Sequence, residues 1–441
     1  MRLGSLFDGS GGFPLGGALC GLEPIWASEI EPFPIRVTTK RFPSVKHYGD
    51  ISVMNGTEVE PVDVITFGSP CQDMSVAGKR AGMKHSELGD EEATRSGLFM
   101  EAVRIIREMQ EATCGIFPRF AVWENVPGAF SSNKGEDFYA VIEELIKVAD
   151  ETAVIPRPPK GKWLNAGQIV GDGYSLAWRV LDAQYWGVPQ RRRRIYLVAD
   201  FAGTSAGEIL FKREGLFRDL ETRGGAGQRT AEDAEGCAGE ANVYPINTQV
   251  ITRHKALGRG TGFGLGACGD PAYTLQEGHA HGVIALNDQG GSQMSVPTYS
   301  IGNGQVNQTG LHEEIVGCLN CRHDQQAILR HDKETQNKTV RRLTPLECAR
   351  LQGFPDWWCD ELETPEPTKE EIEFWAEVWE THRKIIGKSS KPKSRTQLLK
   401  WLKDPRSDSA EYKMWGNGVA LPCVCFVLAG IAEVLCNEDR A

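Results

Sequence analysis

The sequence predicts an α/β fold in which a largely parallel sheet carries helices on both faces, with a smaller, irregular β-rich domain beside it. The first two hundred residues alternate between short apolar runs and stretches with apolar residues at helical spacing. A chain of 441 residues is also too long for one compact unit and suits two. The expected strands are residues 3–7, 24–28, 62–67, 120–123, 176–182 and 194–199, and the expected helices are 14–20, 33–41, 98–110 and 137–149.

The helical pattern is clear in residues 137–149. Phe138, Val141, Ile142, Leu145 and Val148 fall on one stripe, which is typical of a helix that packs against a sheet. Because helices alternate with strands, the strands should run mostly parallel. Ligands of such sheets bind beyond the carboxyl ends of the strands.

The composition divides the chain into three parts. Residues 1–202 form the predicted first domain, and residues 203–340, rich in Gly, Gln, Asn, Thr and His, predict a second domain of short strands and loops. Regular structure returns in residues 341–441, with a helical insertion at about 364–406 and an apolar helix at 419–435. The first strand begins almost at residue 2, so the C-terminal helix is expected to cover one side of its sheet. The two ends of the chain should then meet in one domain.

Composition and cysteine content exclude several classes of protein. With 40% hydrophobic and 24% charged residues, the chain is neither disordered nor membrane-like, and we expect an intracellular protein. Its 12 cysteines are too sparse for a disulfide scaffold. Cys318 and Cys321 have the spacing of metal ligands, but no second pair lies at a suitable distance, so we expect no metal site.

The net charge of −10 does not exclude a nucleic-acid partner, because binding requires a local basic surface and not a basic total. Arg191–Arg194 are four consecutive arginines. Residues 383–406 contain nine Lys or Arg residues and a single acid, Asp404. This second stretch fits a solvated surface and a DNA-binding surface equally well.

A glycine-rich turn follows the first predicted strand. Residues 7–13 read Phe-Asp-Gly-Ser-Gly-Gly-Phe, and such glycines allow a tight turn and a close approach of the backbone to a ligand. Pro14 breaks the dinucleotide pattern Gly-x-Gly-x-x-Gly. Glu29 ends the next strand, where it can accept hydrogen bonds from ribose hydroxyls, and Asp50 and Ile51 are placed to bracket an adenine ring. These features suit a nucleoside ligand without a pyrophosphate.

A cysteine and a glutamate follow two other strands. Cys71 lies in Gly68-Ser69-Pro70-Cys71-Gln72, directly after the strand 62–67, where a thiol would be presented to a ligand. Glu124 begins Glu124-Asn125-Val126-Pro127 at the end of another strand, and its apolar neighbours favour a carboxyl group that donates a proton or a strong hydrogen bond. A thiolate and a proton-donating carboxyl facing one pocket indicate covalent catalysis on an electrophilic ring.

In these motifs the chain resembles the DNA (cytosine-5)-methyltransferase family. The glycine turn is similar to the cofactor loop of that family, Pro70-Cys71-Gln72 to its nucleophile motif, and Glu124-Asn125-Val126 to its carboxylate motif. Four more segments resemble family elements in the same order along the chain: residues 190–194 (Gln-x-Arg-x-Arg), 341–350, 353–355 and 416–419.

The resemblance implies a Rossmann-like methyltransferase sheet and a target-recognition domain at 203–340. It implies transfer of a methyl group from S-adenosylmethionine to carbon 5 of a cytosine in double-stranded DNA, with S-adenosylhomocysteine as product. The cytosine is flipped out of the duplex, and the loop 82–95 closes over it. The implied catalytic residues are Cys71, Glu124, Arg192 and Arg194. The implied cofactor-binding residues are Phe7, Gly9, Gly11, Gly12, Glu29, Asp50, Ile51, Pro70, Leu98, Asn417 and Val419. The implied DNA-binding residues are Gln72, Arg191, Arg193, Arg253 and Arg322.

Two departures from the family pattern affect the cofactor site. Gly418 stands where the family often has Ser, and Ile30 stands where an aromatic side chain often stacks on the adenine. The insertion 364–406 has no counterpart in the minimal form of the family, and it fits either a packed helical decoration or an added DNA clamp.

Two rival functions remain open, methylation of cytosine in transfer RNA and nucleic-acid binding without catalysis. The large polar middle domain favours duplex DNA, and the presence of Cys71, Glu124 and the arginine run favours catalysis. We expect a monomer, with a companion restriction nuclease as an optional partner.

Overall fold

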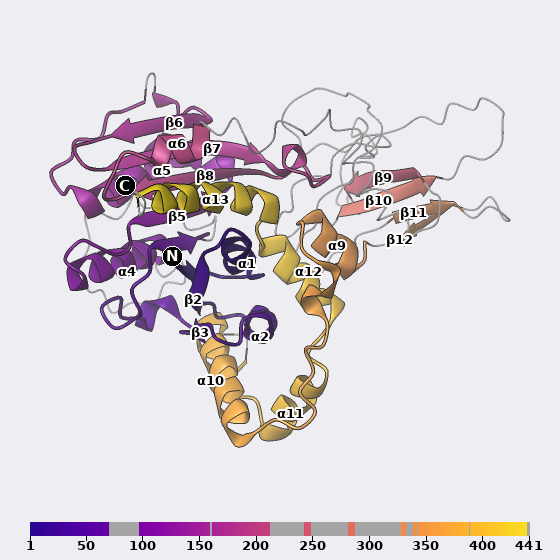
Figure 1. The fold of residues 1–441 in the computed structure, drawn as a ribbon. Helices are drawn as coiled ribbons and strands as arrows, with labels where there is room; N and C mark the ends of the chain where they lie inside the picture. The colour runs from indigo at the N-terminus through magenta and orange to yellow at the C-terminus, as the bar shows by residue number, and fades with distance from the viewer. Residues whose placement is uncertain are drawn as a thin grey trace, which may run out of the picture.

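The computed structural model describes residues 1–69, 97–158, 161–211, 343–387 and 389–438, and the backbone of four further strands. Its main feature is an eight-stranded sheet in the order β3-β2-β1-β4-β5-β8-β7-β6 (Figure 1). The strands are β1 (Arg2–Leu6), β2 (Glu23–Ser28), β3 (Lys46–His47), β4 (Val64–Phe67), β5 (Phe120–Asn125), β6 (Ala166–Val170), β7 (Ser175–Asp182) and β8 (Arg193–Asp200).

The sheet has a parallel half and an antiparallel half. Strands β3, β2, β1, β4 and β5 pair in parallel, as the alternation of strands and helices predicts. From β5 onward, β8, β7 and β6 pair antiparallel. The prediction of a largely parallel sheet therefore holds for the first five strands only, because β6, β7 and β8 follow one another without a crossover helix and pair as neighbours.

Helices cover both faces of this sheet, as predicted. One face packs against α4 (Leu98–Ala112) and α5 (Glu136–Ala149). The other packs against α1 (Gly12–Leu19), α6 (Ala206–Phe211) and α13 (Leu421–Glu438). The side chains of β5 point alternately to the two faces of the sheet. Ala121 and Trp123 pack into the core beneath α4 and α5, whereas Phe120 and Val122 pack into the core beneath α1, α6 and α13. Burial on both faces explains why this strand reads as a continuous apolar run.

The two ends of the chain meet, as expected. The C-terminal helix α13 lies beside α1, and the Cys20 thiol donates a hydrogen bond to the Cys425 carbonyl oxygen at 3.4 Å (Figure 1). A Cβ atom on Gly16 would lie 2.6 Å from Cγ1 of Val424, so the glycine permits this close approach. Helix α13 is long and apolar enough to cross a membrane by length and composition alone, with a mean hydropathy of 1.7. Its buried residues belong to the core beneath the sheet.

The remaining elements lie beside the main sheet. A four-stranded sheet in the order β12-β11-β10-β9 stands apart from it (Figure 1). Its strands are β9 (Asn242–Asn247), β10 (His281–Leu286), β11 (Ile328–His331) and β12 (Lys338–Arg341). The domain boundaries at 202 and 340 stay a prediction.

The remaining helices are α2 (Pro32–Arg41), α9 (Pro345–Leu351), α10 (Lys369–Ile386), α11 (Arg395–Lys403) and α12 (Asp408–Asn417). Short 3-10 helices are η1 (Ile51–Val53), η4 (Pro127–Phe130), η5 (Ser132–Gly135), η7 (Ala183–Tyr185) and η8 (Asp356–Cys359).

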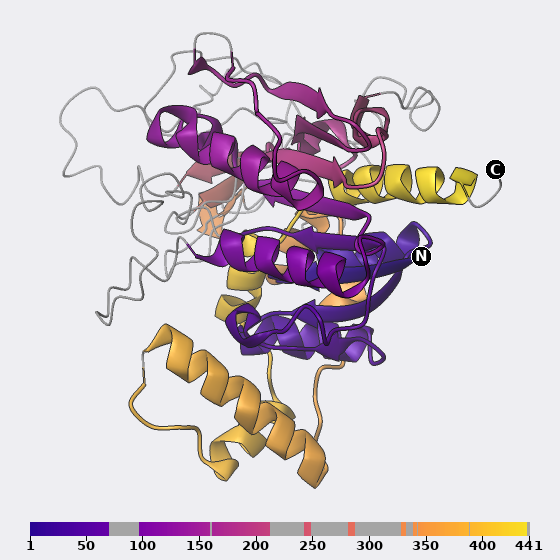
Figure 2. The same ribbon diagram turned by 90° about the vertical axis from the view of Figure 1, so that its left-hand side faces the viewer.

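The insertion forms a helical hairpin of α10 and α11 that projects from the body of the protein (Figures 1 and 2). Its three tryptophans pack together: the ring of Trp401 lies 5.0 Å from that of Trp375 and 5.4 Å from that of Trp379. The hairpin is joined to α2 by Arg36, whose guanidinium donates to the Leu362 carbonyl at 2.7 Å and lies over the Trp375 ring.

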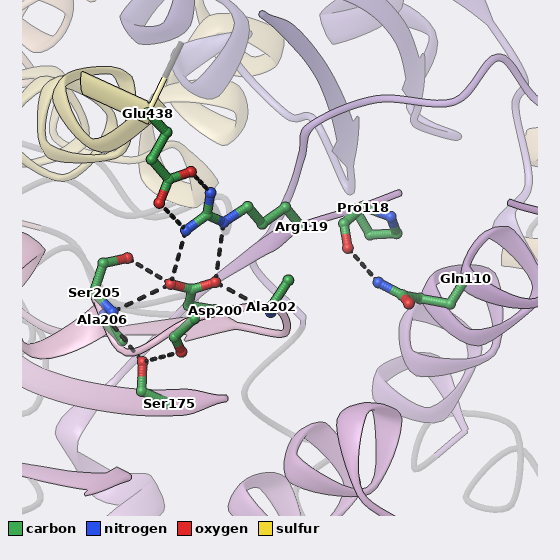
Figure 3. A network of polar contacts seen from close by, with 10 residues as sticks. Gln110, Pro118, Arg119, Ser175, Asp200, Ala202, Ser205, Ala206 and Glu438 are labelled. Atoms are coloured by element: carbon green, nitrogen blue, oxygen red, sulfur yellow. Dashed lines mark hydrogen bonds and ion pairs between the residues drawn. The ribbon is translucent and has the colours of Figure 1, made fainter. Parts of the chain in front are cut away.

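A polar network ties α13 to the edge of the sheet opposite the carboxyl ends of the parallel strands (Figure 3). The Asp200 side chain is fully buried at the end of β8 and pairs with Arg119 at 3.2 Å. It also accepts hydrogen bonds from the Ser205 hydroxyl at 2.5 Å and from the backbone amide of Ala202 at 3.2 Å. Arg119 in turn pairs with Glu438 in the last turn of α13.

We expect Asp200→Ala to lower the free energy of unfolding by roughly 3 kcal/mol, because it leaves the guanidinium of Arg119 and three donors, the Ser205 hydroxyl and the amides of Ala202 and Ser205, without their buried acceptor. Glu438→Ala is the matched control, since the side chain of Glu438 is 53% exposed and its pair should contribute less than about 1 kcal/mol. Urea denaturation followed by circular dichroism measures both values. Equal losses in the two variants would contradict this ranking.

Candidate active site

The carboxyl ends of β1, β2, β4 and β5 meet at one edge of the sheet because these strands pair in parallel. Strand β8 runs in the opposite direction, so its first residues reach the same edge. Glu124 pairs in register with Tyr196, and Asn125 with Ile195. The predicted carboxylate and the arginine run, about seventy residues apart in the sequence, are thereby brought side by side.

Glu124 and Arg194 form a buried ion pair. Nε of Arg194 lies 3.1 Å from Oε1 of Glu124, and the two side chains are 8% and 11% exposed. The geometry of this contact is not that of a hydrogen bond, and Oε1 accepts none from any other described residue. A buried acceptor with spare capacity at a sheet edge is suited to a hydrogen bond from a ligand.

The four arginines separate into two kinds. Arg192 and Arg194 are buried, whereas Arg191 and Arg193 are exposed. The guanidinium of Arg192 donates to the carbonyl oxygen of Gly418, in the turn between α12 and α13. The sequence does not distinguish these four residues by type. The alternation of an extended chain explains the difference.

The nucleophile motif lies just beyond the described residues, since Pro70, Cys71 and Gln72 fall outside them. The chain is described as far as Ser69, which is bound to the end of β5. The Asn125 side-chain amide donates to the Ser69 carbonyl at 3.1 Å, and the Trp123 indole N–H donates to the Ser69 hydroxyl at 3.1 Å. A Cβ atom on Gly68 would lie 3.4 Å from Oε2 of Glu124.

Sequence reasoning missed the role of Ser69. Its hydroxyl and carbonyl groups hold the segment that leads to Cys71 against the strand that carries Glu124. The only signal in the sequence is a polar residue between the strand and the proline, which is common in loops.

The glycine turn has the tight, left-handed backbone that its glycines allow. Gly9 and Gly11 have φ values of +56° and +77°, and Phe7 has a φ of +54°. Glu29 closes the turn, because Oε2 accepts a hydrogen bond from the Gly9 amide at 2.7 Å. Its other oxygen accepts from the amides of Ile30 and Glu31, and burial raises the pKa of the carboxyl group.

Two buried polar atoms of the turn have no hydrogen-bond partner among the described residues, Oδ2 of Asp8 and Oγ of Ser10. Burial raises the pKa of Asp8 to about 7, although the Ser5 hydroxyl donates to it at 2.7 Å and opposes the shift. Orphaned polar atoms beneath a strained turn fit a polar ligand such as the amino-acid part of S-adenosylmethionine.

The segment 417–419 packs against this turn, as the order of the motifs predicts. A Cβ atom on Gly12 would lie 2.4 Å from Cγ2 of Val419. A Cβ atom on Gly418 would lie 2.6 Å from the Ser10 hydroxyl. The departure at Gly418 therefore has a physical reason, since Ser10 occupies the space that a side chain at position 418 would need.

The other predicted cofactor residues lie near the same edge. The Asp50 carboxylate caps η1 by accepting from the Ser52 amide at 2.9 Å. The Ile51 side chain is buried in the core, and Leu98 packs against that core at the start of α4. Asn417 is exposed at the end of α12.

Several predictions fall outside the described residues: the loop 82–95, Arg253, Arg322 and the Cys318–Cys321 pair. Within the part of the chain that is described, no group of three His, Cys, Asp or Glu side chains is placed to hold a metal ion.

Comparison with known proteins identifies the family. A model of the C-5 cytosine-specific DNA methylases matches residues 1–149 and 166–370. The chain belongs to this family.

The chain is also similar to individual family relatives. It is 28% identical to a DNA N-6-adenine-methyltransferase of Escherichia phage P1, over 95% of this chain and 59% of that protein. It is 30% identical to the type II methyltransferase M.MspI of Moraxella sp, over 44% of this chain and 37% of that protein. It is 28% identical to M.HhaI of Haemophilus parahaemolyticus, over 45% and 48% of the two chains. The chain thus spans about a third to three fifths of the length of these relatives.

The fold is that of a known methyltransferase. The structure of the S. pombe Dnmt2 methyltransferase matches with a TM-score of 0.52 and 16% identity, over 99% of each chain. The α/β fold with its mixed sheet is therefore confirmed. Membership of a methyltransferase family implies S-adenosylmethionine as the methyl donor.

The contact between the two cofactor motifs of this family member can be tested directly. Gly12→Ala places a methyl group into Val419, and overpacking of this kind costs about 1–3 kcal/mol. We expect weaker binding of S-adenosylhomocysteine, measured by isothermal titration calorimetry. The double variant Gly12→Ala/Val419→Ala removes the clash and should recover at least part of the affinity. No recovery would show that Gly12 is needed for another reason.

Proposed function

We propose that the chain transfers a methyl group from S-adenosylmethionine to carbon 5 of a specific cytosine in double-stranded DNA, with Cys71 as nucleophile. One observation carries this proposal: the chain leading to Cys71 is hydrogen-bonded through Ser69 to Asn125, beside the buried Glu124–Arg194 pair, and Gly68 passes close to Glu124. The glycine turn lies at the same edge of the sheet, so donor and base can be held together. The family model supports cytosine as the base and DNA as the substrate.

Carbon 5 of cytosine is a poor nucleophile, so the ring requires activation. The Cys71 thiolate forms a bond to carbon 6, and the displaced electron pair makes carbon 5 nucleophilic. Glu124 supports this step through a hydrogen bond or a proton at ring nitrogen 3. Bound S-adenosylmethionine supplies the electrophilic methyl group. A base then removes the proton from carbon 5, the sulfur–carbon bond breaks, and the Cys71 thiolate is restored.

The arginines take three roles in this proposal. Arg194 holds the Glu124 carboxyl group, and in this proposal it also stabilises the oxygen of the base. Arg192 donates to the Gly418 carbonyl and so holds the segment 417–419, which packs against the glycine turn. Arg191 and Arg193 are exposed and suit contacts with DNA phosphates, which offset the cost of flipping the base, about a few kcal/mol.

Gln72, Arg253 and Arg322 are proposed DNA contacts on the basis of family resemblance alone. A companion nuclease fits the type II names of several relatives. In this proposal the protein acts inside the cell as a monomer. The phage P1 relative is named for adenine methylation, and 41% of its length lies outside the match (100% minus 59%).

We expect Cys71→Ser to abolish methyl transfer, because a serine hydroxyl does not supply the thiolate that adds to carbon 6. Glu124→Gln should retain S-adenosylhomocysteine binding and lose at least about a hundredfold in turnover, as is typical on loss of general acid–base support. Tritium transfer from labelled cofactor to DNA measures the turnover of both variants, and isothermal titration calorimetry measures the binding of S-adenosylhomocysteine. A serine variant as active as the wild type would remove the covalent mechanism.

Expression in a host that lacks cytosine methylation should produce 5-methylcytosine at a defined sequence. Genome-wide mapping of modified bases identifies the base and its recognition sequence together. The Cys71→Ser variant is the control, and it should leave the genome unmodified. Methylated adenine, or methylated transfer RNA with unmodified DNA, would favour the rival functions instead.

A further inference from the structure

The helical insertion is anchored at the catalytic edge of the sheet. In the last turns of α10, Nε2 of His382 lies 3.3 Å from a carboxylate oxygen of Glu31. Lys413 of α12 contacts the other oxygen of the same carboxylate. Burial alone would raise the pKa of Glu31, but the hydrogen bonds and charges of His382 and Lys413 lower it to about 2. The carboxylate therefore stays ionised and joins three segments of the chain.

This anchor determines where the end of α10 lies. Glu31 follows the carboxyl end of β2 by three residues and comes directly before α2. The C-terminal end of α10 is thus attached to the edge that carries the proposed site. Figure 2 agrees with this placement, since β1 runs from the marked N-terminus toward the side on which the α10–α11 turn lies.

The turn and α11 present a basic surface at this position, which we call the basic hairpin face. Its cations are exposed, and none of them forms an ion pair with a described acid. They lie in a stretch with nine basic residues and one acid, within a chain of net charge −10. The face comprises Lys391, Lys393, Arg395, Lys400 and Lys403.

Contacts within the hairpin hold this face in place. Arg383 donates to the Ser389 carbonyl at 3.2 Å, and the Ser389 hydroxyl donates to the Lys391 carbonyl at 3.0 Å. The ammonium group of Lys393 lies 4.0 Å from the centre of the Trp379 ring. Cations on an ordered turn lose less conformational entropy on binding than cations on a free chain.

We propose that the basic hairpin face binds the phosphate backbone of duplex DNA outside the target base pair and so lengthens the stretch of DNA that the enzyme contacts. This inference rests on the proposed function, and it assigns a role to an insertion that the catalytic steps do not use. Three observations support it: the charge of the face, its unpaired exposed cations, and its anchoring through Glu31 at the catalytic edge. Phosphate is the ligand that such a row of unpaired cations complements.

The test replaces three cations that make no packing contact with a tryptophan, Lys391→Gln, Arg395→Gln and Lys400→Gln, in one variant. The probe is a 60-base-pair duplex with one recognition site, bound at several salt concentrations. We expect Kd to rise on the order of tenfold, and the slope of log K against log salt to fall by up to about 3, because each lost phosphate contact removes roughly 0.9. Turnover at saturating DNA should remain unchanged, and hydroxyl-radical footprints should shorten on one side of the target.

The control variant carries the same charge change at cations on elements outside the hairpin, Lys46→Gln, Lys147→Gln and Lys162→Gln. It should bind like the wild type. Equal Kd, salt slope and footprint for the hairpin variant and the wild type would overturn the inference, as would equal weakening in both variants. Failure of the proposed function is distinguishable, because the wild-type protein would then not methylate the duplex at all.

Discussion

The buried ion pair between Glu124 and Arg194 depends on a change of strand direction in the middle of the sheet. Had β8 continued the parallel arrangement, Arg194 would lie at the opposite edge, away from the glycine turn. The antiparallel pairing of β5 with β8 places both groups at the carboxyl edge and buries them to about a tenth of their exposure. Burial has a cost for each charge alone, so neither residue is easily lost without the other.

The sequence allowed the parallel half of the fold to be predicted well. Apart from the two-residue strand β3, which was not predicted, the strands and helices from residue 2 to 149 lie within a few residues of the expected positions. The apolar stripes of α4 and α5 and the buried runs of the strands explain this agreement. The antiparallel half could not be predicted in the same way. A buried strand shows the same apolar run in either direction, and only the lengths of the connections distinguish the two arrangements.

The site shows a similar division. The family resemblance assigns Gly12 and Val419 to one cofactor site, and in the structure the two residues pack together although more than four hundred residues separate them. The sequence did not reveal which arginines face inward, or that Ser69 is hydrogen-bonded to the end of β5, because both depend on the geometry of neighbouring strands. Gly418 is a second example. The sequence suggests that a side-chain contact of the family is missing at this position, whereas in the structure Ser10 fills the space that such a side chain would need.

Net charge and surface charge lead to different conclusions for this protein. A chain of net charge −10 repels DNA at long range, yet its described acids are often paired or buried, as Asp200 and Glu31 are. The cations at Lys391, Arg395 and Lys400 have no such partners among the described residues. Since salt screens long-range repulsion within roughly 8–10 Å, contacts at the phosphate backbone depend on these local groups and not on the total. Local pairing therefore decides which charges of an acidic protein remain available to a polyanion.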